Sequence, residues 1–343
     1  MAMAMIDVGA NLTDPVFTGL YRGKQRHEAD LSAVLARAKS YGVEKVIVTG
    51  GNLEESRSAL KLAVEYSDDA LPSLYSTVGV HPTRCQEFEA KGNDANEYFA
   101  ELLAVCEQGQ RDGKVVAIGE CGLDYDRLEF CDKPTQRKYF EKQFALAEQT
   151  RLPMFLHNRN TDGDFHGKLR AVVNSVPMVA ENRQRFSNGV VHSFTGTKEE
   201  MLQLVELDLY IGKRPSYQHK IRVLTAENLE CVKAIPLNRL MLETGNSSLF
   251  SYSPPSSIET DVICLAASFP LDAPWCDIRA THAGYSHVKT SWPTKKAENL
   301  PPASSLYQQC HNSQVLEIVS AIRGEAQEEV AARVYENTQR VFF

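Results

Sequence analysis

The chain has 343 residues, a formal net charge of −7 and 43% hydrophobic residues, which is typical of a globular protein with a sizeable core. The acidic balance disfavours a protein that binds nucleic acid through a broad basic surface, but not an enzyme that grips a phosphodiester locally. No apolar run approaches the roughly 20 residues needed to span a bilayer. The eight cysteines lack Cys-x-x-Cys spacing and indicate reduced thiols. We therefore expect a cytoplasmic or nuclear protein with no membrane partner and no obligate protein partner.

Short apolar runs alternate with longer amphipathic stretches along the whole chain. The runs lack strict polar–apolar alternation, as do strands buried on both faces of a parallel sheet. They lie at residues 5–8, 45–49, 75–80, 115–118, 153–156, 189–191, 207–211 and 239–242. The stretches predict helices at 29–40, 53–66, 95–110, 135–150, 198–207 and 226–235, with closing helices at 314–323 and 325–343. This order predicts an α/β fold, a (β/α)₈ TIM-type barrel, as one domain over residues 5–343.

Polar side chains stand directly after most of the predicted strands. They are Asn11 after the first, His81 after the third, Glu120 after the fourth, His157 after the fifth, His192 after the sixth and Glu243 after the eighth. Parallel strands deliver their carboxyl ends to the same rim of a barrel. Residues far apart in the sequence therefore converge on one mouth, where barrel active sites sit.

Glu120, His157 and His192 together predict a metal site. Glu120 leaves a buried strand in Gly-Glu-Cys-Gly-Leu-Asp, and a carboxylate there is costly unless it meets a cation or several donors. Either histidine alone would more often be a hydrogen-bonded core residue than a ligand. With a carboxylate on a neighbouring strand, they make a mixed nitrogen–oxygen site for one or two divalent ions. His81 is a fourth member that could ligate metal, contact the substrate or shuttle a proton.

Six segments resemble the TatD-type DNase family, in its eukaryotic branch, which belongs to the amidohydrolase-like metal-dependent hydrolases. The segments are Asn-Leu-Thr-Asp, Gly-Val-His-Pro, Gly-Glu-Cys-Gly-Leu-Asp, Leu-His-Asn-Arg-Asn, Val-His-Ser-Phe-Thr-Gly-Thr and Asp-Ala-Pro-Trp. They fall in order over nearly the whole chain. The resemblance implies a deoxyribonuclease that hydrolyses DNA phosphodiester bonds as a 3′–5′ exonuclease. It also implies two divalent cations per chain, Mg²⁺ first, with Mn²⁺ or Zn²⁺ as alternatives.

The resemblance also implies roles for individual residues. Glu120 would bridge two metal positions, His157 and His192 would hold one ion, and Asp272 of Asp-Ala-Pro-Trp would hold the other and orient the attacking water. His81 would sit at the phosphate. The implied catalytic set is therefore Glu120, Asp272 and His81, and it agrees with the logic of two-metal hydrolysis.

Other positions near the implied site depart from the family or stay open. Many relatives carry a His-x-His pair after the first strand, where this chain has Asn11-Leu-Thr. One metal position is therefore expected to be looser and filled only with substrate bound. Arg84 and Arg159 are candidates for phosphate contact, with a surface or supporting role equally open for each.

The chain interrupts the family motif Glu-Thr-Asp-Ala-Pro-Trp. Glu243-Thr is followed by residues 245–271, and only then comes Asp272-Ala-Pro-Trp. This atypical insert is rich in serine and matches neither a helical nor a strand pattern. It contains a second Glu-Thr-Asp ending at Asp261, which is a weaker ligand candidate than Asp272 because Ala-Pro-Trp does not follow it.

Two hypotheses account for the insert. Gly-Asn at its start can be encoded with a splice donor, and Leu-Asp at its end with a splice acceptor. Removal of the intervening bases would restore Glu-Thr-Asp-Ala-Pro-Trp, so that residues 245–271 would be the translation of a retained intron. The competing hypothesis is a lid or docking loop over the barrel mouth.

Two other functions stay open. The first is a barrel hydrolase of another small-molecule ester or amide. Many such enzymes place a carbamylated lysine on the fourth strand, whereas this chain has Glu120 there, which favours the nuclease. The second is a catalytically impaired homologue that acts as a binding protein, because the eighth strand is separated from Asp272.

Overall fold

The computed structural model describes residues 3–21, 23–25, 28–90, 92, 94–167, 177–213, 226–243 and 311–343. Asp261, Asp272 and the segment 245–271, on which several predictions fall, lie outside these residues. All that follows concerns the described part of the chain.

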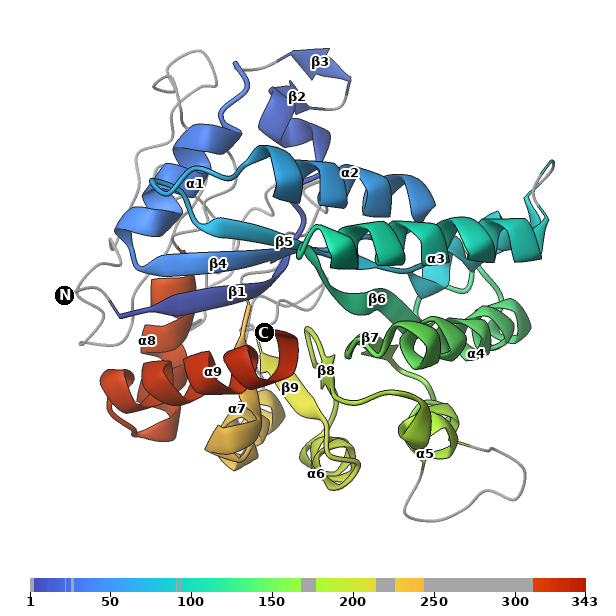
Figure 1. The fold of residues 1–343 in the computed structure, drawn as a ribbon. Helices are drawn as coiled ribbons and strands as arrows, with labels where there is room; N and C mark the ends of the chain where they lie inside the picture. The colour runs from blue at the N-terminus through green and yellow to red at the C-terminus, as the bar shows by residue number, and fades with distance from the viewer. Residues whose placement is uncertain are drawn as a thin grey trace, which may run out of the picture.

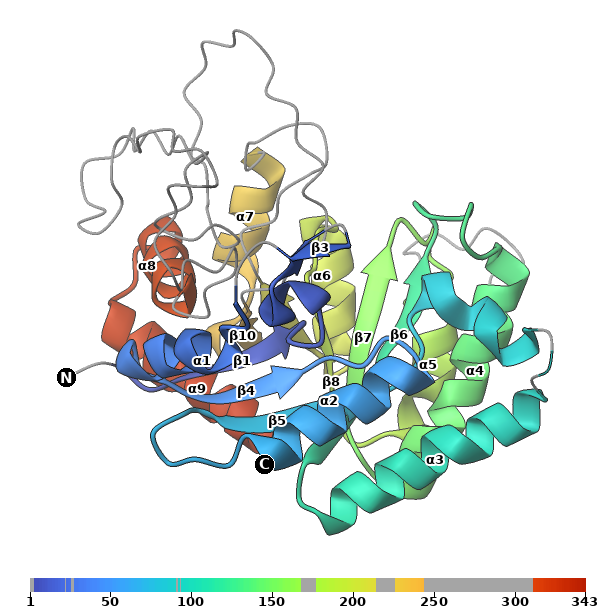
Figure 2. The ribbon, with the colours of Figure 1, turned by 90° about the horizontal axis from the view of Figure 1, so that it is seen from above.

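Eight parallel strands form one sheet in the order β1-β4-β5-β6-β7-β8-β9-β10. They are β1 (Met5–Ala10), β4 (Val43–Val48), β5 (Ser73–Val78), β6 (Val115–Asp124), β7 (Met154–Arg159), β8 (Gly189–Val191), β9 (Tyr210–Lys213) and β10 (Leu240–Leu242). Residues of β1 also contact β10 across the remaining seam, so the sheet curls into a nearly closed barrel (Figures 1 and 2). The predicted (β/α)₈ fold is confirmed.

Helices surround the strands on the outside of the barrel (Figure 1). They are α1 (Leu31–Ser40), α2 (Leu53–Glu65), α3 (Ala95–Arg111), α4 (Lys133–Thr150), α5 (Met178–Asn182), α6 (Lys198–Glu206), α7 (Ala226–Ala234), α8 (His311–Arg323) and α9 (Gln327–Phe342). All of the predicted helices are present, with ends that differ by a few residues. None of the helices in the described ranges combines the length and apolar character needed to cross a bilayer.

Several short elements were not predicted. They are α5, the hairpin of β2 (Leu20–Tyr21) and β3 (Lys24–Gln25), and the 3₁₀ helices η1 (Pro15–Thr18), η2 (Pro82–Glu89), η3 (Arg183–Arg185) and η4 (Leu237–Arg239). These segments are too short to show a recognisable hydrophobic period. Of them, η2 matters most, because it begins directly after His81.

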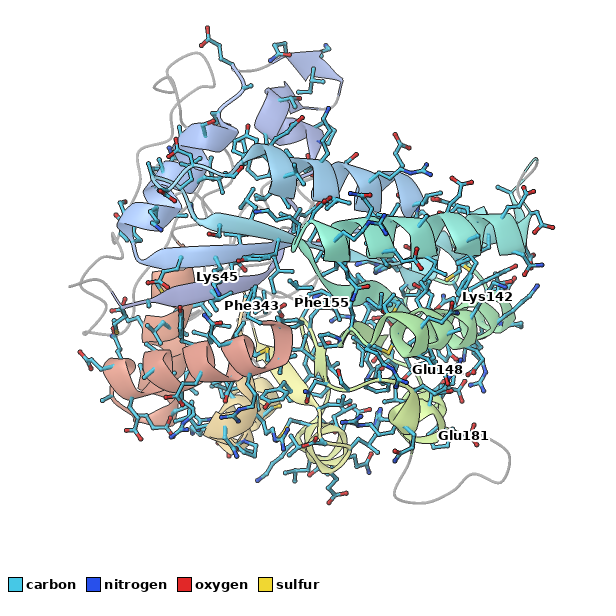
Figure 3. All side chains as sticks on the ribbon, viewed as in Figure 1. Lys45, Lys142, Glu148, Phe155, Glu181 and Phe343 are labelled. Atoms are coloured by element: carbon cyan, nitrogen blue, oxygen red, sulfur yellow. The ribbon has the colours of Figure 1, made fainter. Side chains whose placement is uncertain are left out.

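The barrel has an interior core that is closed at its amino-terminal end. Phe155 and other interior strand residues pack with Val341 and Phe342 at the end of α9. Beyond them, Nζ of Lys45 lies 3.8 Å from the centre of the Phe343 ring, and both side chains lie at this end of the barrel (Figure 3). The predicted site residues lie at the opposite rim, to which the strands deliver their carboxyl ends.

Two fully buried glutamines of α4 hold the backbone at that rim. The Gln143 side chain accepts a hydrogen bond from the Val80 amide at 2.7 Å and donates to the Val80 carbonyl at 3.0 Å. Gln136 accepts from the Asp124 amide at 2.8 Å and donates to the Asp124 carbonyl at 2.8 Å. The two glutamines are seven positions apart, about two helical turns, so both lie on one face of the helix. Helix α4 thus fixes the backbone beside His81 and at Asp124.

Candidate metal centre

The strand that carries Glu120 runs further than its sequence predicts. The expected end before Glu120 is wrong, because β6 continues to Asp124, with a shift of register against β7. Gly119 and Gly122 adopt φ angles of 142° and 146°. A Cβ at these positions would lie 2.1 Å and 2.0 Å from carbonyl oxygens of β7. Glycine is therefore required at both positions, and it lets β6 approach β7 closely on either side of Glu120.

Three donor atoms from neighbouring strand ends meet at the rim. Nδ1 of His157 lies 2.8 Å from Oε1 of Glu120, and Nε2 of His192 lies 2.6 Å from the same oxygen. The two nitrogens are 3.4 Å apart. His157 is buried, and the side chains of Glu120 and His192 are mostly so. The structure thus brings together the three residues from which the sequence predicts a metal site.

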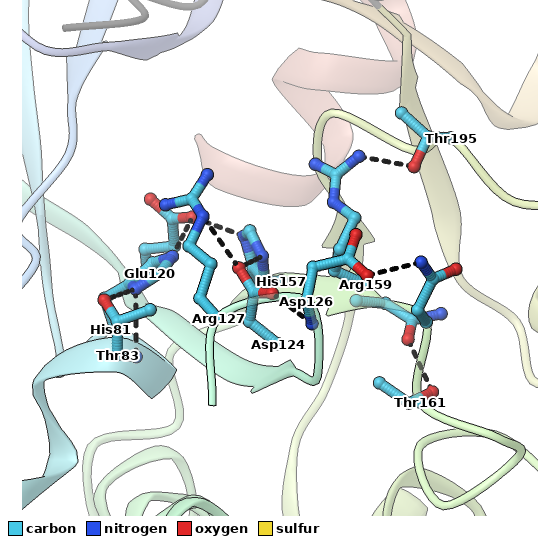
Figure 4. A network of polar contacts seen from close by, with 12 residues as sticks. His81, Thr83, Glu120, Asp124, Asp126, Arg127, His157, Arg159, Thr161 and Thr195 are labelled. Atoms are coloured by element: carbon cyan, nitrogen blue, oxygen red, sulfur yellow. Dashed lines mark hydrogen bonds and ion pairs between the residues drawn. The ribbon is translucent and has the colours of Figure 1, made fainter. Parts of the chain in front are cut away.

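His81 completes the same cluster from the segment between β5 and η2. Its Nε2 lies 3.4 Å from Oε1 of Glu120, and its ring meets that of His157 edge to face with centroids 4.6 Å apart. Nδ1 of His81 accepts a hydrogen bond from the Thr83 amide at 3.2 Å, so the neutral ring carries its proton on Nε2 (Figure 4). Burial lowers the pKa of His81 to about 3. Its imidazole is therefore neutral at pH 7 and presents an N–H group to the centre.

Two further carboxylates contact the outer nitrogens of the histidine pair. Nε2 of His157 lies 3.1 Å from Oδ2 of Asp124, and Nδ1 of His192 lies 3.4 Å from Oε2 of Glu243. Both carboxylates belong to fully buried residues. A carboxylate at one ring nitrogen holds the proton there and leaves the lone pair on the other. When both rings are neutral, as metal ligands must be, this arrangement directs the lone pairs of His157 and His192 toward Glu120.

The charges in the cluster are suited to binding a cation. Burial would raise the pKa of Glu120, but the imidazoles of His192, His81 and His157 lower it well below its usual range. Burial would lower the pKa of His192, but Glu120 and Glu243 raise it to about 9. In the metal-free protein an imidazolium therefore balances the Glu120 carboxylate. Two imidazole nitrogens and a carboxylate oxygen at these distances also fit a divalent cation.

A second group of potential ligands overlaps the first. One donor atom each of His81, Asp124 and His157 lie within 4.8 Å of one another. His157 belongs to both groups.

The two arginines predicted to contact phosphate have different surroundings. Arg84 forms ion pairs with Glu87 and, at 3.4 Å, with Glu55, so its guanidinium already faces two carboxylates. Arg159 extends from the end of β7 and donates to the Thr195 hydroxyl (Figure 4). Arg159 thus lies at the same rim as the centre, and its contact with phosphate stays a prediction (Figure 4).

The sequence pattern did not predict the contacts that Asp124, Arg127 and Glu243 make at the centre. Side chains four residues apart in a strand share a face, so Asp124 would have been placed beside Glu120 had the strand been extended through Gly-Leu-Asp. Arg127 follows in the next loop, with its Nε 3.5 Å from Oδ2 of Asp124. Glu243 was located at a strand end, but its contact with His192 depends on tertiary packing.

A nearly closed (β/α)₈ barrel with a carboxylate and histidines at its carboxyl-terminal rim defines a barrel hydrolase with a candidate divalent-metal centre. The model of the TatD related DNases matches residues 6–343. The chain therefore belongs to the TatD-type DNase family, and the resemblance seen in its motifs is confirmed.

Similar proteins come from eukaryotes and bacteria. A Schizosaccharomyces pombe protein named deoxyribonuclease Tat-D is 36% identical over 342 residues, which is 98% of this chain and 95% of that protein. An Edwardsiella piscicida protein named 3′-5′ ssDNA/RNA exonuclease TatD is 36% identical over 240 residues, 70% of this chain and 78% of that protein. The crystal structure of a TatD family hydrolase from Entamoeba histolytica superposes with a TM-score of 0.75 at 31% identity, covering 100% of this chain and 99% of that one.

Proposed function

We propose that the protein is a metal-dependent deoxyribonuclease that hydrolyses DNA phosphodiester bonds, as a 3′–5′ exonuclease. The observation that carries this proposal is the meeting of Oε1 of Glu120, Nδ1 of His157 and Nε2 of His192 at one point of the barrel rim. Family membership supports it, since relatives carry the names deoxyribonuclease and 3′-5′ ssDNA/RNA exonuclease. We place the enzyme in the cytoplasm or nucleus, with DNA as its substrate.

Glu120, His157 and His192 would hold one divalent cation, with Mg²⁺ first and Mn²⁺ or Zn²⁺ as alternatives. A cation there supplies Lewis acidity toward a phosphoryl oxygen and makes water a stronger nucleophile near neutral pH. A second cation held by Glu120 and Asp272 stays a prediction, because Asp272 lies outside the described residues. With one cation or two, the protein's contribution is to fix the positions of the ligand atoms.

His81 would act on the substrate side of the centre. Its imidazole is neutral at pH 7 and carries its proton on Nε2, 3.4 Å from Oε1 of Glu120. An N–H group beside the metal ligands can donate a hydrogen bond to a phosphate oxygen as negative charge develops there. Arg159 would bind phosphate at the rim, and Arg84 would do so only if substrate displaces Glu55 or Glu87.

A nuclease assay tests the proposal directly. A 3′-labelled single-stranded oligodeoxynucleotide should be shortened from its labelled end in Mg²⁺ or Mn²⁺ and remain intact in EDTA. Hydrolysis of a small ester or amide without hydrolysis of DNA would point instead to another barrel hydrolase. Metal binding with no hydrolysis of any of these substrates would point to a binding protein and contradict the nuclease.

Metal binding to the metal-free protein should be coupled to proton release from His192. Its pKa is raised to about 9, whereas a ligand must present a neutral imidazole. We expect the apparent affinity for Mn²⁺ to rise about tenfold per pH unit below that pKa, and to level off above it. Isothermal titration calorimetry in buffers of different ionisation enthalpy measures both quantities. An affinity that does not change between about pH 6 and 8 would contradict the imidazolium at this site.

The raised pKa of His192 also makes the stability of the folded protein depend on pH. A pKa raised from 6.5 to about 9 favours the folded, metal-free protein fully below pH 6.5, and this contribution is lost as the pH rises through about 9. Metal should therefore stabilise the protein more at alkaline pH than at acid pH. Thermal melts with and without Mn²⁺ across this range measure the difference.

Asp124→Asn should weaken metal binding about 10- to 100-fold, as does loss of other carboxylates that orient histidine ligands. An asparagine amide is a weaker acceptor and can also donate, so it no longer fixes the proton on Nε2 of His157. Calorimetry gives the affinity, and ¹⁵N chemical shifts of the imidazoles give the tautomer. Asp126→Asn is the matched control, because the exposed Asp126 carboxylate contacts Asn160 at 2.6 Å. Equal metal affinities in the two variants would refute the positioning role of Asp124.

A further inference from the structure

The loop after β6, residues 125–132, is anchored at both ends. The Tyr125 hydroxyl donates a hydrogen bond to Oδ2 of Asp164 at 2.7 Å. At the other end, Cys131 is fully buried and Asp132 caps the first turn of α4. The middle of the loop is therefore held on a fixed frame at the same rim as the metal centre.

This middle part exposes apolar surface. Phe130 is 58% exposed, the largest value among the large apolar side chains of the described residues, and Leu128 is 38% exposed. The Phe130 amide donates to the Arg127 carbonyl at 3.1 Å, which closes the chain into a tight turn. Single exposed apolar residues are ordinary on protein surfaces. Two of them in one anchored turn beside a catalytic rim instead suggest contact with a ligand.

Arg127 connects this turn to the metal centre. Its Nε lies 3.5 Å from Oδ2 of Asp124, the oxygen that contacts Nε2 of His157 at 3.1 Å. Figure 4 shows the Arg127 side chain extended from the loop to its ion pair with Asp124. Within the described residues, its two terminal nitrogens have no hydrogen-bond partner. A guanidinium with such N–H groups is suited to bind phosphate.

We propose that residues 127–130 form a nucleotide platform, in which Arg127 binds a phosphate of the substrate and Phe130 stacks on the base of an unpaired nucleotide. A cationic group beside an exposed aromatic ring is the combination that proteins use to hold single strands. This inference rests on the proposed nuclease function and deepens it. The ring can stack only on a base that is free of its partner, so the platform selects single-stranded substrate ends. It also explains how a chain with a net charge of −7 can hold a polyanion through local contacts.

Steady-state kinetics on a 3′-labelled single-stranded oligodeoxynucleotide test the stacking contact. Phe130→Ala should raise the KM about 5-fold or more, and Phe130→Trp should keep the wild-type value. The matched control is Tyr41→Ala, because Tyr41 is a 46% exposed aromatic residue between α1 and β4, at the opposite end of the barrel. Mn²⁺ affinity and melting temperature should be unchanged in all three variants.

Substrates with abasic residues near the 3′ end separate stacking from other effects. Removing the stacked base should raise the wild-type KM as much as Phe130→Ala does, and Phe130→Ala should then add nothing. Arg127→Ala should raise the KM for normal and abasic substrates alike, because its contact is with phosphate. These results together would support the platform.

Other outcomes would overturn it. One is that the wild type degrades DNA and Phe130→Ala leaves the KM unchanged. The other is that Phe130→Ala raises the KM equally for abasic and normal substrates. If the wild type degrades no DNA, the proposed nuclease function fails. Fluorescence anisotropy with the same oligonucleotides then still tests the platform, and equal Kd values for wild type and Phe130→Ala would reject it.

Discussion

Glu120→Ala should abolish divalent-metal-dependent hydrolysis of DNA while the barrel stays folded. Oε1 of Glu120 lies 2.8 Å, 2.6 Å and 3.4 Å from nitrogens of His157, His192 and His81. The substitution removes the carboxylate on which these rings converge. Changes in residues that merely orient metal ligands already cost about 10- to 100-fold. We therefore expect kcat/KM to fall by more than that range, to below detection.

The measurement combines activity, metal affinity and folding. Calorimetry should show loss of tight Mn²⁺ binding, while circular dichroism shows an unchanged fold, because no hydrophobic core residue is altered. Without the Glu120 carboxylate, the pKa of His192 should also fall from its raised value. The control is Glu65→Ala, since Glu65 is an exposed glutamate that pairs with Lys61 at 3.7 Å. Full activity in Glu120→Ala would remove this centre from the mechanism.

Deletion of residues 245–271 is expected to raise kcat on the order of 10²-fold. The deletion joins Glu243-Thr to Asp272-Ala-Pro-Trp and restores the family motif. Glu243 is fully buried and contacts His192 at 3.4 Å, so an aspartate two residues further on would have a fixed place near the centre. Misplacement of a catalytic group by about 1 Å can cost about 10²-fold in rate. Asp272 itself lies outside the described residues.

The full-length and shortened chains should be assayed side by side with the same oligonucleotide. In the shortened chain, Asp272→Ala should remove the gain, whereas Asp261 is absent and cannot compensate. Sequencing of transcripts across the junction separates a retained intron from a lid or docking loop. A shortened chain that is no more active than the full-length one would show that the interruption has no catalytic cost.

The sequence predicted the frame of the candidate site well because parallel strands impose convergence. Because the apolar runs are parallel strands, Glu120, His157 and His192 are expected to meet at one rim, and they do. Asp124 was missed because the predicted strand stopped too early. Its extension depends on Gly119 and Gly122 fitting against β7, which is a property of the packed barrel rather than of local pattern.

The residues of the nucleotide platform illustrate a second limit on predicting the site from the sequence. Nothing in Arg-Leu-Glu-Phe separates a surface turn from a buried one, because the exposure of Phe130 depends on how Tyr125 and Cys131 anchor the loop. The role of Glu243 depends in the same way on the ring orientation of His192. Local pattern thus predicts which residues reach the rim, while hydrogen bonds between distant segments decide what each one contacts there.

Helix α4 provides no predicted metal ligand, yet its buried glutamines support the rim on which the candidate site is built. Gln136 and Gln143 each satisfy both backbone groups of one residue at the rim, as a neighbouring strand would. Mutational tolerance along α4 should therefore be uneven, with free variation on its outer face and strict requirements at these two inward positions. Any redesign of metal preference would have to treat α4 and the strand ends as one unit.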